Sequence, residues 1–230
     1  MDTTPYQEFA KQYLGGAFER LELLVTAFTH RSYLNEHKKS ASEHNERLEF
    51  LGDAVLELVV TEFLYNNYSE PEGILTNWRS SLVRTESIGA AATRLGAEKL
   101  LRLSRGEKRG TDRARAQILA NSFEAIVGAL YVERGYEACR TFITENILST
   151  FDDILKTGSW MDPKSRLQEL VQGQVGATPS YRVLSEEGPD HEKEFTVGVY
   201  VHEKLAGRGT GPSKQAAQVA AATSALQKYI

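Results

Sequence analysis

The stretch HNERLEFLGDAVLEL, residues 44–58, has the apolar spacing of a helix that packs into a core. Its apolar positions are Leu48, Leu51, Val55 and Leu58. The same stretch carries Glu46, Glu49 and Asp53, which fall within roughly one 60° arc of a helix that turns about 100° per residue. Surface helices usually offset such acids with Lys or Arg three or four residues away, but the nearby Arg47 points elsewhere. Because like charges on one stripe repel, the sequence predicts that a cation neutralises them.

A second helix supplies further oxygen ligands. The stretch ILANSFEAIVGALY, residues 118–131, places Asn121 and Glu124 three residues apart inside an otherwise apolar helix. Packing of the two helices would bring this pair together with Glu49 and Asp53. Mg²⁺ prefers oxygen ligands and usually needs more than one carboxylate, so such a cluster is typical of metal-assisted phosphodiester hydrolysis. The spacing alone leaves open the alternative that these acids only form a solvated face.

Two further acids lie close to this pattern. Glu72 stands in a turn at residues 71–73 and adds a carboxylate to the set of candidates. Glu57 lies on the same helical arc as Asp53. We interpret Glu57 as a solvent-facing or ion-paired residue rather than a ligand.

The composition excludes several classes of protein. The 230 residues are 41% hydrophobic and 25% charged, and the net charge of -4 argues against a protein that coats nucleic acid nonspecifically. One cysteine, Cys139, excludes an internal disulfide and a Cys-rich zinc site, and it fits a reducing compartment. The apolar runs are too short to cross a bilayer, and the N-terminus does not resemble a signal peptide. We expect a cytoplasmic protein with no membrane association and no nucleotide cofactor.

Helical periodicity runs through most of the first two thirds of the chain. The predicted helices cover residues 6–14, 21–28, 46–65, 75–95, 116–131 and 136–147. Thr76 is a candidate cap for the fourth of them, and the basic stretch 105–115 is interpreted as an exposed loop. The pattern predicts an all-α domain over residues 1–152 and a linker over residues 153–160.

The pattern changes in kind after the linker. Residues 163–174 have helical spacing, and strands are predicted at residues 180–185, 194–202 and 205–209. Ser213 is expected to cap an alanine-rich helix that runs to the end of the chain. Residues 161–230 therefore predict a small α+β domain of order α-β-β-β-α, with two helices against an antiparallel sheet.

These motifs together resemble the ribonuclease III family, whose members are endonucleases specific for double-stranded RNA. The resemblance rests on HNERLEFLGDAVLE, on THRSYLNE before it, and on PEGILTNWRSSLV and ILANSFEAIVGALY after it. The C-terminal unit is similar to the family's double-stranded RNA-binding domain, with PKSRLQE at its start and GTGPSKQAAQVAA at its last helix. The similarity covers nearly the whole chain in the family's domain order.

Carried over position by position, the resemblance implies roles for the acids. Glu49, Asp53 and Glu124 match metal ligands, and Asp53 and Glu124 are also expected to be catalytic. Glu46 and Glu72 match acids that line the catalytic valley and assist at the scissile phosphate.

One position departs from the family pattern, which usually has Asp where this chain has Asn121. The amide oxygen is still a hard ligand, so Asn121 is expected to bind the metal with one charge fewer. A weakened charge-assisted contact costs about 1.5–3 kcal/mol, which is enough for an order of magnitude in affinity or rate. Whether Asn121 is natural or engineered stays open.

The resemblance also implies an RNA-binding face on the second domain. It places Gln168 and Glu169 at one minor groove and His191 at the next, while Ser213 and Lys214 open the last helix toward phosphate. The family usually has a run of lysines at that helix start, and the domain's eight basic and eight acidic residues cancel. Its affinity for RNA should therefore be modest and salt-sensitive. A protein–protein module of the same fold is the alternative.

The basic stretch could add RNA contacts to the first domain. Arg105, Lys108 and Arg109 lie shortly before the helix that carries Asn121 and Glu124. We expect RNA to contact these residues, although a run of charge is also compatible with a solvated surface.

The resemblance implies a homodimeric, Mg²⁺-dependent endoribonuclease in which Phe50 packs into the partner subunit and Mn²⁺ replaces Mg²⁺. It would cut double-stranded RNA to 5′-phosphate and 3′-hydroxyl ends in rRNA and mRNA processing. Two alternatives stay open: a noncatalytic double-stranded RNA-binding protein impaired at Asn121, and a structural component of a ribonucleoprotein. The acids that this chain keeps at the other family positions argue against the structural component. For Phe50, an ordinary core position is the alternative.

Overall fold

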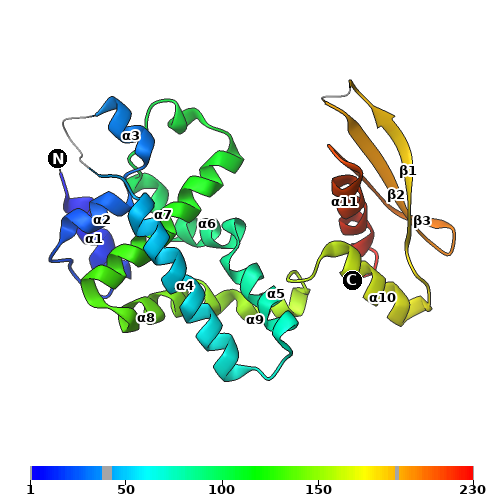
Figure 1. Cartoon of the computed structure of the whole chain (residues 1–230), viewed down its shortest axis with the longest axis horizontal. Helices are drawn as coiled ribbons and strands as arrows, with labels where there is room; N and C mark the ends of the chain where they lie inside the picture. The colour runs from blue at the N-terminus through cyan, green and yellow to red at the C-terminus, as the bar shows by residue number, and fades with distance from the viewer. Residues whose placement is uncertain (1, 38–42, 190–191, 230) are drawn as a thin grey trace. The chain divides into compact units, whose positions relative to one another are not determined.

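The computed structural model describes residues 2–37, 43–189 and 192–229. The chain forms two compact units, Met1–Ile154 and Leu155–Ile230 (Figure 1). In the described part of the chain, no helix is both long enough and apolar enough to cross a membrane.

The first unit is helical. Its α-helices are α1 (Thr4–Tyr13), α2 (Leu21–Ala27), α3 (Arg31–Glu36), α4 (Glu46–Asn67), α5 (Glu72–Val83), α6 (Thr85–Arg94), α7 (Asp112–Arg134), α8 (Tyr136–Asn146) and α9 (Phe151–Thr157). The described residues of this unit also include the short 3-10 helices η1 (Ala97–Leu100), η2 (Glu107–Arg109) and η3 (Leu148–Thr150). The all-α prediction for this domain is confirmed. Helix α9 includes residues 153–157, which were predicted as linker, and it ends in the second unit.

The long helices α4 and α7 cross in the first unit (Figure 1). Two glycines, Gly52 and Gly128, lie at the closest contact. A Cβ atom at Gly52 would lie 1.7 Å from the carbonyl oxygen of Glu124, and one at Gly128 would lie 2.1 Å from the carbonyl oxygen of Leu48. No side chain fits at either distance, so the crossing requires glycine at both positions. This contact fixes the two helices against each other within one turn of the acids.

Two predictions about the fourth helix are wrong. Residues 75–95 form two helices rather than one, because Arg84 adopts an extended conformation with ψ 153° between α5 and α6. Helix α5 also begins earlier, at Glu72, directly after Pro71. Thr76 therefore lies inside α5 and cannot cap it.

Helix α7 also begins earlier than predicted. The hydroxyl of Thr111 accepts a hydrogen bond from the backbone N–H of Ala114 at 3.3 Å, which is the geometry of an N-cap. Arg113 and Arg115 therefore belong to α7, and only the first part of the predicted basic loop lies outside it. The capping signal is local, but the polar residues after Thr111 do not show the apolar period on which the prediction relied.

The second unit has the predicted order. It consists of α10 (Pro163–Val175), β1 (Ser180–Glu187), β2 (Glu194–Val201), β3 (Lys204–Gly211) and α11 (Lys214–Leu226). The strands form an antiparallel sheet in the order β1-β2-β3. Alternate residues of β2, Val197, Val199 and Val201, are buried in a core with α10 and α11. Ser213 caps α11 by accepting a hydrogen bond from the backbone N–H of Ala216 at 3.1 Å, which confirms the expected cap.

Candidate active site

Helix α7 is buried along most of its second half, and two polar residues there are exceptions. Between Ile118 and Leu130, every residue of α7 is buried except Asn121 and Glu124, which are partly exposed. These two side chains share one face of the helix because they are three residues apart. Helix α7 therefore packs into the core on nearly all sides and presents oxygen-bearing groups on one.

The α4–α7 crossing brings these groups beside the acids of α4. Burial and, to a smaller extent, the negative charges of Asp53 and Glu49 together raise the pKa of Glu124 to about 8. The pKa of Glu49 is also raised, first by burial, and by the charges of Glu46 and Asp53. A hydrogen bond from the side chain of Asn121 acts in the opposite direction. The structure thus gathers Glu49, Asp53, Glu124 and Asn121 in one cluster.

Glu46 lies at the edge of this cluster and has a partner of its own. A guanidinium nitrogen of Arg31 lies 2.5 Å from its carboxylate, and Nδ1 of His44 lies 3.9 Å away. Arg31 was not among the predicted site residues, because it stands on α3, fifteen residues before Glu46. The only feature of the sequence that points to a role for Arg31 is its place in the stretch THRSYLNE.

In the part of the chain that the structure describes, the other three acids have no ion-pair partner. Among the described residues, no Lys, Arg or His side chain forms an ion pair with Glu49, Asp53 or Glu124. A cation placed among neighbouring carboxylates binds favourably, because it relieves the repulsion between their negative charges. Their oxygens are the hard ligands that Mg²⁺ and Mn²⁺ prefer, so the donor set fits a divalent ion.

The side chains are near one another but not yet in chelating positions. In residues 2–37, 43–189 and 192–229, no group of three or more His, Cys, Asp or Glu side chains is arranged to hold a metal ion. The backbone placement on α4 and α7 is set by the glycine crossing. Rotation of the Glu49, Asp53 and Glu124 side chains is therefore the movement that ion binding would require.

Comparison with known proteins assigns both units. Residues 21–151 match the family described as Ribonuclease-III-like, and residues 163–229 match the double-stranded RNA binding motif. The chain belongs to the ribonuclease III family. Ribonuclease 3 of Oceanobacillus iheyensis is 44% identical over 230 residues, which cover 98% of this chain and 97% of that protein. Ribonuclease 3 of Bdellovibrio bacteriovorus is 44% identical over 222 residues, which cover 95% and 94% of the two chains.

A solved structure agrees with this assignment. The nuclease domain of ribonuclease III from Campylobacter jejuni matches with a TM-score of 0.56 and 37% sequence identity, over 63% of this chain and 98% of that one. That work is described as showing structural flexibility in a region involved in dimer formation. The family resemblance found in the sequence is thereby confirmed, together with an all-α nuclease domain and a C-terminal RNA-binding domain.

Two other acids considered in the sequence lie apart from the cluster. Glu72 was predicted from the resemblance to ribonuclease III, and Glu57 was considered because it shares the helical arc of Asp53. Glu72 is exposed at the start of α5 and lines a separate groove with Thr61 and Tyr65. Glu57 lies 3.7 Å from a guanidinium nitrogen of Arg79, which confirms its interpretation as an ion-paired residue.

Helix α4 exposes apolar side chains on a face beside the acids. Phe50 is 81% exposed, Leu58 is 56% exposed and Tyr65 is 77% exposed. At about 100° per residue, these positions fall within roughly one 80° arc. We call these three residues the α4 apolar face. Leu58 was predicted as a core residue and this is wrong, since α7 covers only the opposite side of α4. Phe50 is likewise not an ordinary core phenylalanine.

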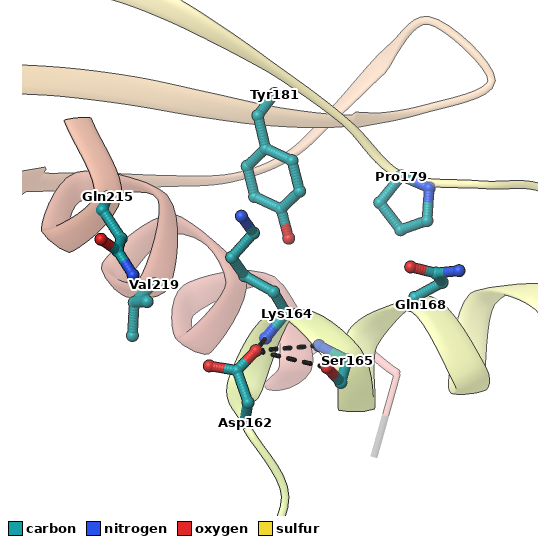
Figure 2. Close-up of a pocket in the computed structure, with 8 residues that line it drawn as sticks. All are labelled: Asp162, Lys164, Ser165, Gln168, Pro179, Tyr181, Gln215 and Val219. Atoms are coloured by element: carbon teal, nitrogen blue, oxygen red, sulfur yellow. Dashed lines mark hydrogen bonds between the residues drawn. The ribbon is translucent and has the colours of Figure 1, made fainter.

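The RNA-binding domain of this ribonuclease III homologue presents its predicted contacts on accessible surface. Gln168 and Glu169 on α10 are exposed, as are Ser213 and Lys214 at the start of α11. His191 lies outside the described residues. A groove joins the two helix starts, and Figure 2 shows the side chains that line it. They are Asp162, Lys164, Ser165, Gln168, Pro179, Tyr181, Gln215 and Val219.

One cation in this groove was not anticipated. The ammonium group of Lys164 donates a hydrogen bond to Oε1 of Gln218 at 2.8 Å and lies 5.1 Å from the centre of the Tyr181 ring. Lys164 therefore links α10, α11 and β1, next to the exposed Gln168 (Figure 2). Its position supplies part of the positive charge that the start of α11 lacks.

The basic stretch of the nuclease domain is exposed at Arg105, Lys108 and Arg109. Lys108 and Arg109 lie in the short 3-10 helix η2. The backbone N–H of Arg105 donates to the carboxylate of Glu36 at 3.2 Å, which ties this segment to α3. The three side chains remain accessible to a nucleic acid backbone.

Proposed function

We propose that this protein is a divalent-metal-dependent endoribonuclease that cleaves double-stranded RNA. The observation that carries the proposal is the cluster of Glu49, Asp53 and Glu124, with which no Lys, Arg or His side chain of the described residues forms an ion pair. It occurs in a chain whose second domain matches the double-stranded RNA binding motif. The alternative of a noncatalytic binding protein is not favoured, because all three carboxylates are present in spite of Asn121.

In this proposal the residues of the cluster have different roles, which depend on where they lie. Glu49, Asp53 and Glu124 would hold the ion, with Asn121 beside them, and Mn²⁺ would fit the same oxygen ligands. When bound, the ion supplies Lewis acidity and an activated water, so that hydrolysis leaves 5′-phosphate and 3′-hydroxyl ends. Glu46, which forms an ion pair with Arg31 at the edge of the cluster, would orient groups at the scissile phosphate.

RNA would be held by surfaces on both domains. Gln168, Glu169 and His191 would read the minor grooves, and Ser213 and Lys214 would meet phosphate. Arg105, Lys108 and Arg109 would add phosphate contacts from the nuclease domain. The substrates we propose are rRNA precursors and structured mRNAs, cleaved in the cytoplasm.

A second copy of the chain would cover the α4 apolar face. Phe50, Leu58 and Tyr65 form an exposed apolar strip, and the related Campylobacter jejuni structure has a region involved in dimer formation. Two-fold pairing of α4 with its copy brings opposite ends of the two helices together. Glu72, which lies beside Tyr65 at the far end of α4, would then approach the acid cluster of the partner.

The Phe50→Ala variant is expected to dimerise about 10²–10⁴-fold more weakly than the wild type. A fully buried phenylalanine contributes about 1.5–3 kcal/mol, and a two-fold interface contains two copies. Sedimentation equilibrium over a dilution series measures the change. Leu184→Ala, at a partly exposed apolar position in the RNA-binding domain, should leave the dissociation constant unchanged. Equal dissociation constants for Phe50→Ala and wild type would exclude this interface.

Cleavage of a labelled RNA duplex by the wild type and by Asn121→Asp tests the catalytic proposal. The wild type should cut the duplex and leave the same strand intact when it is single-stranded. Asn121→Asp adds a negative charge to the cluster, so its half-maximal rate should require about tenfold less Mg²⁺. Titrations with Mg²⁺ and Mn²⁺ measure both effects. If neither protein cuts while both bind the duplex, the noncatalytic alternative is correct.

A further inference from the structure

The ammonium group of Lys164 lies between the two helices of the RNA-binding domain, where neutral groups hold it. It donates a hydrogen bond to Oε1 of Gln218 on α11 at 2.8 Å, and it lies 5.1 Å from the centre of the Tyr181 ring on β1. An amide oxygen and an aromatic face attract a cation without cancelling its charge. Among the described residues, no carboxylate forms an ion pair with Lys164. The ion pairs of the described chain therefore leave the charge of Lys164 uncompensated.

The acid nearest to Lys164 in the sequence, Asp162, has another role. Its carboxylate caps α10 by accepting hydrogen bonds from the backbone N–H groups of Lys164 at 3.0 Å and Ser165 at 3.1 Å. Figure 2 shows the side chain of Lys164 directed away from this carboxylate, toward the ring of Tyr181. The carboxylate thus stabilises the start of the helix, while the side chain of Lys164 lines the groove between α10 and α11.

The rest of this groove offers further hydrogen-bond donors. Its lining includes the hydroxyl group of Ser165 and the side-chain amides of Gln168 and Gln215 (Figure 2). All three residues are exposed. Ammonium, hydroxyl and amide groups are the side-chain donors that proteins commonly use to bind the phosphate oxygens of a nucleic acid. The groove therefore has the chemistry of a phosphate site.

The groove also lies between two predicted RNA contacts of the domain. Gln168 on α10 is predicted to read a minor groove, and Lys214 at the start of α11 is predicted to meet phosphate. A domain of this kind contacts successive minor grooves and the phosphates that border the major groove between them. The sugar–phosphate backbone that separates these grooves would pass between the two contacts, where Lys164 lies. Lys214 is the only basic residue in the sequence of α11, so a second cation is needed here.

We propose that Lys164 is an RNA-binding residue that contacts a phosphate of the duplex at the junction of α10 and α11. The inference rests on the proposed function and adds to it a contact that the sequence did not predict. The bond to Gln218 and the ring of Tyr181 hold the ammonium group in place before RNA binds. Less side-chain freedom is then lost on binding.

A purely structural role for Lys164 is the contrary interpretation. In that case its bond to Gln218 only holds α10 against α11, and its charge does not matter to RNA. Two substitutions of Gln218 separate the roles. Gln218→Ala removes the bond between the helices and leaves the charge of Lys164 in place, whereas Gln218→Glu keeps a partner for Lys164 and neutralises its charge.

Binding of a labelled RNA duplex to the full-length protein tests the contact, with fluorescence anisotropy measured in a chelator so that the duplex stays uncut. One phosphate contact contributes about 0.9 to the slope of the logarithm of affinity against the logarithm of salt concentration. We expect Lys164→Met and Gln218→Glu to lower this slope by about 0.9 between about 50 and 200 mM salt. Both should bind about tenfold more weakly at the lower salt concentration. Lys164→Arg and Gln218→Ala should keep the wild-type slope, because each retains the charge.

Lys204→Met is the matched control. It removes one exposed cation at the start of β3, at a position that does not line the groove, and it should keep the wild-type slope. A wild-type slope in Lys164→Met or in Gln218→Glu would overturn the phosphate contact, and weaker binding by Gln218→Ala would then assign Lys164 the structural role. If the wild type does not bind the duplex at all, the proposed RNA-binding function fails together with this inference.

Discussion

Replacing Glu124 with glutamine is expected to lower the rate of duplex cleavage by about 10³-fold. The substitution keeps the size of the side chain and removes one carboxylate from the cluster of Glu49, Asp53 and Glu124. A metal ion contributes several kcal/mol to the stabilisation of a phosphoryl transition state, and a loss of about 4 kcal/mol corresponds to this change in rate. Single-turnover cleavage at high Mg²⁺ measures the effect, since it is independent of product release.

The matched control is Glu145→Gln, which makes the same replacement at an exposed position of α8. It should cleave at the wild-type rate. A Glu124→Gln protein that cleaves at more than about a tenth of the wild-type rate would remove Glu124 from the proposed set of ligands.

The same variant should change how the stability of the metal-free protein depends on pH. The pKa of Glu124 rises from an ordinary value of 4.5 to about 8 in the folded state, first through burial. The folded state therefore binds this proton more tightly than the unfolded chain does. Its stabilising contribution is complete below pH 4.5 and is lost as the pH rises through 8.

Glu124→Gln carries no charge to lose, so it should be more stable than the wild type at pH 9 and similar to it at pH 4. We expect a difference on the order of 2 kcal/mol at pH 9, because the half-buried carboxylate keeps part of its solvation. Urea unfolding in the presence of a chelator measures it. A difference that is the same at both pH values would contradict this account of Glu124.

The Gly52→Ala variant is expected to lose at least about 3 kcal/mol in the free energy of unfolding of the nuclease domain. Its new methyl group would meet the backbone of Glu124 at 1.7 Å, and a backbone atom cannot turn aside as a side chain can. Helices α4 and α7 would have to separate, which moves Glu49 and Asp53 away from Glu124. Cleavage activity should therefore fall together with stability.

Gly73→Ala provides the control within the same domain. It lies in the first turn of α5, and an added Cβ atom would have no neighbour within 4 Å. This variant should be as stable as the wild type or more stable by about 0.5–1 kcal/mol, since alanine favours a helix. Urea unfolding of both variants makes the comparison. A Gly52→Ala protein as stable as Gly73→Ala would show that the helix crossing tolerates a larger separation.

Much of the architecture was predictable because its signals are local. The apolar period along residues 46–65 identifies α4, and alternation in residues 194–202 identifies β2, whose inward valines form the core of the second domain. The stretch after Ser213 likewise combines a cap with an alanine-rich helix. In each case neighbouring residues contain the information, since helix and strand periods extend over only a few positions.

The errors arose where tertiary contacts decide between local alternatives. The extended conformation of Arg84 divides a continuous helical pattern into α5 and α6, and the position of α7 leaves Leu58 in solvent. Periodicity shows that one face of α4 is apolar, but it does not show how far a neighbouring helix covers that face.

By itself, the sequence determined the family, the two-domain order and the acids that share one stripe on α4. Only the tertiary structure decided how those acids are compensated. Arg31 reaches Glu46 from α3, and Nε2 of Gln117 donates a hydrogen bond to Oδ1 of Asn121 beside the cluster. The physical reason is that an ion pair or hydrogen bond between distant residues depends on which helices meet and how closely, and for α4 and α7 the glycine crossing sets both.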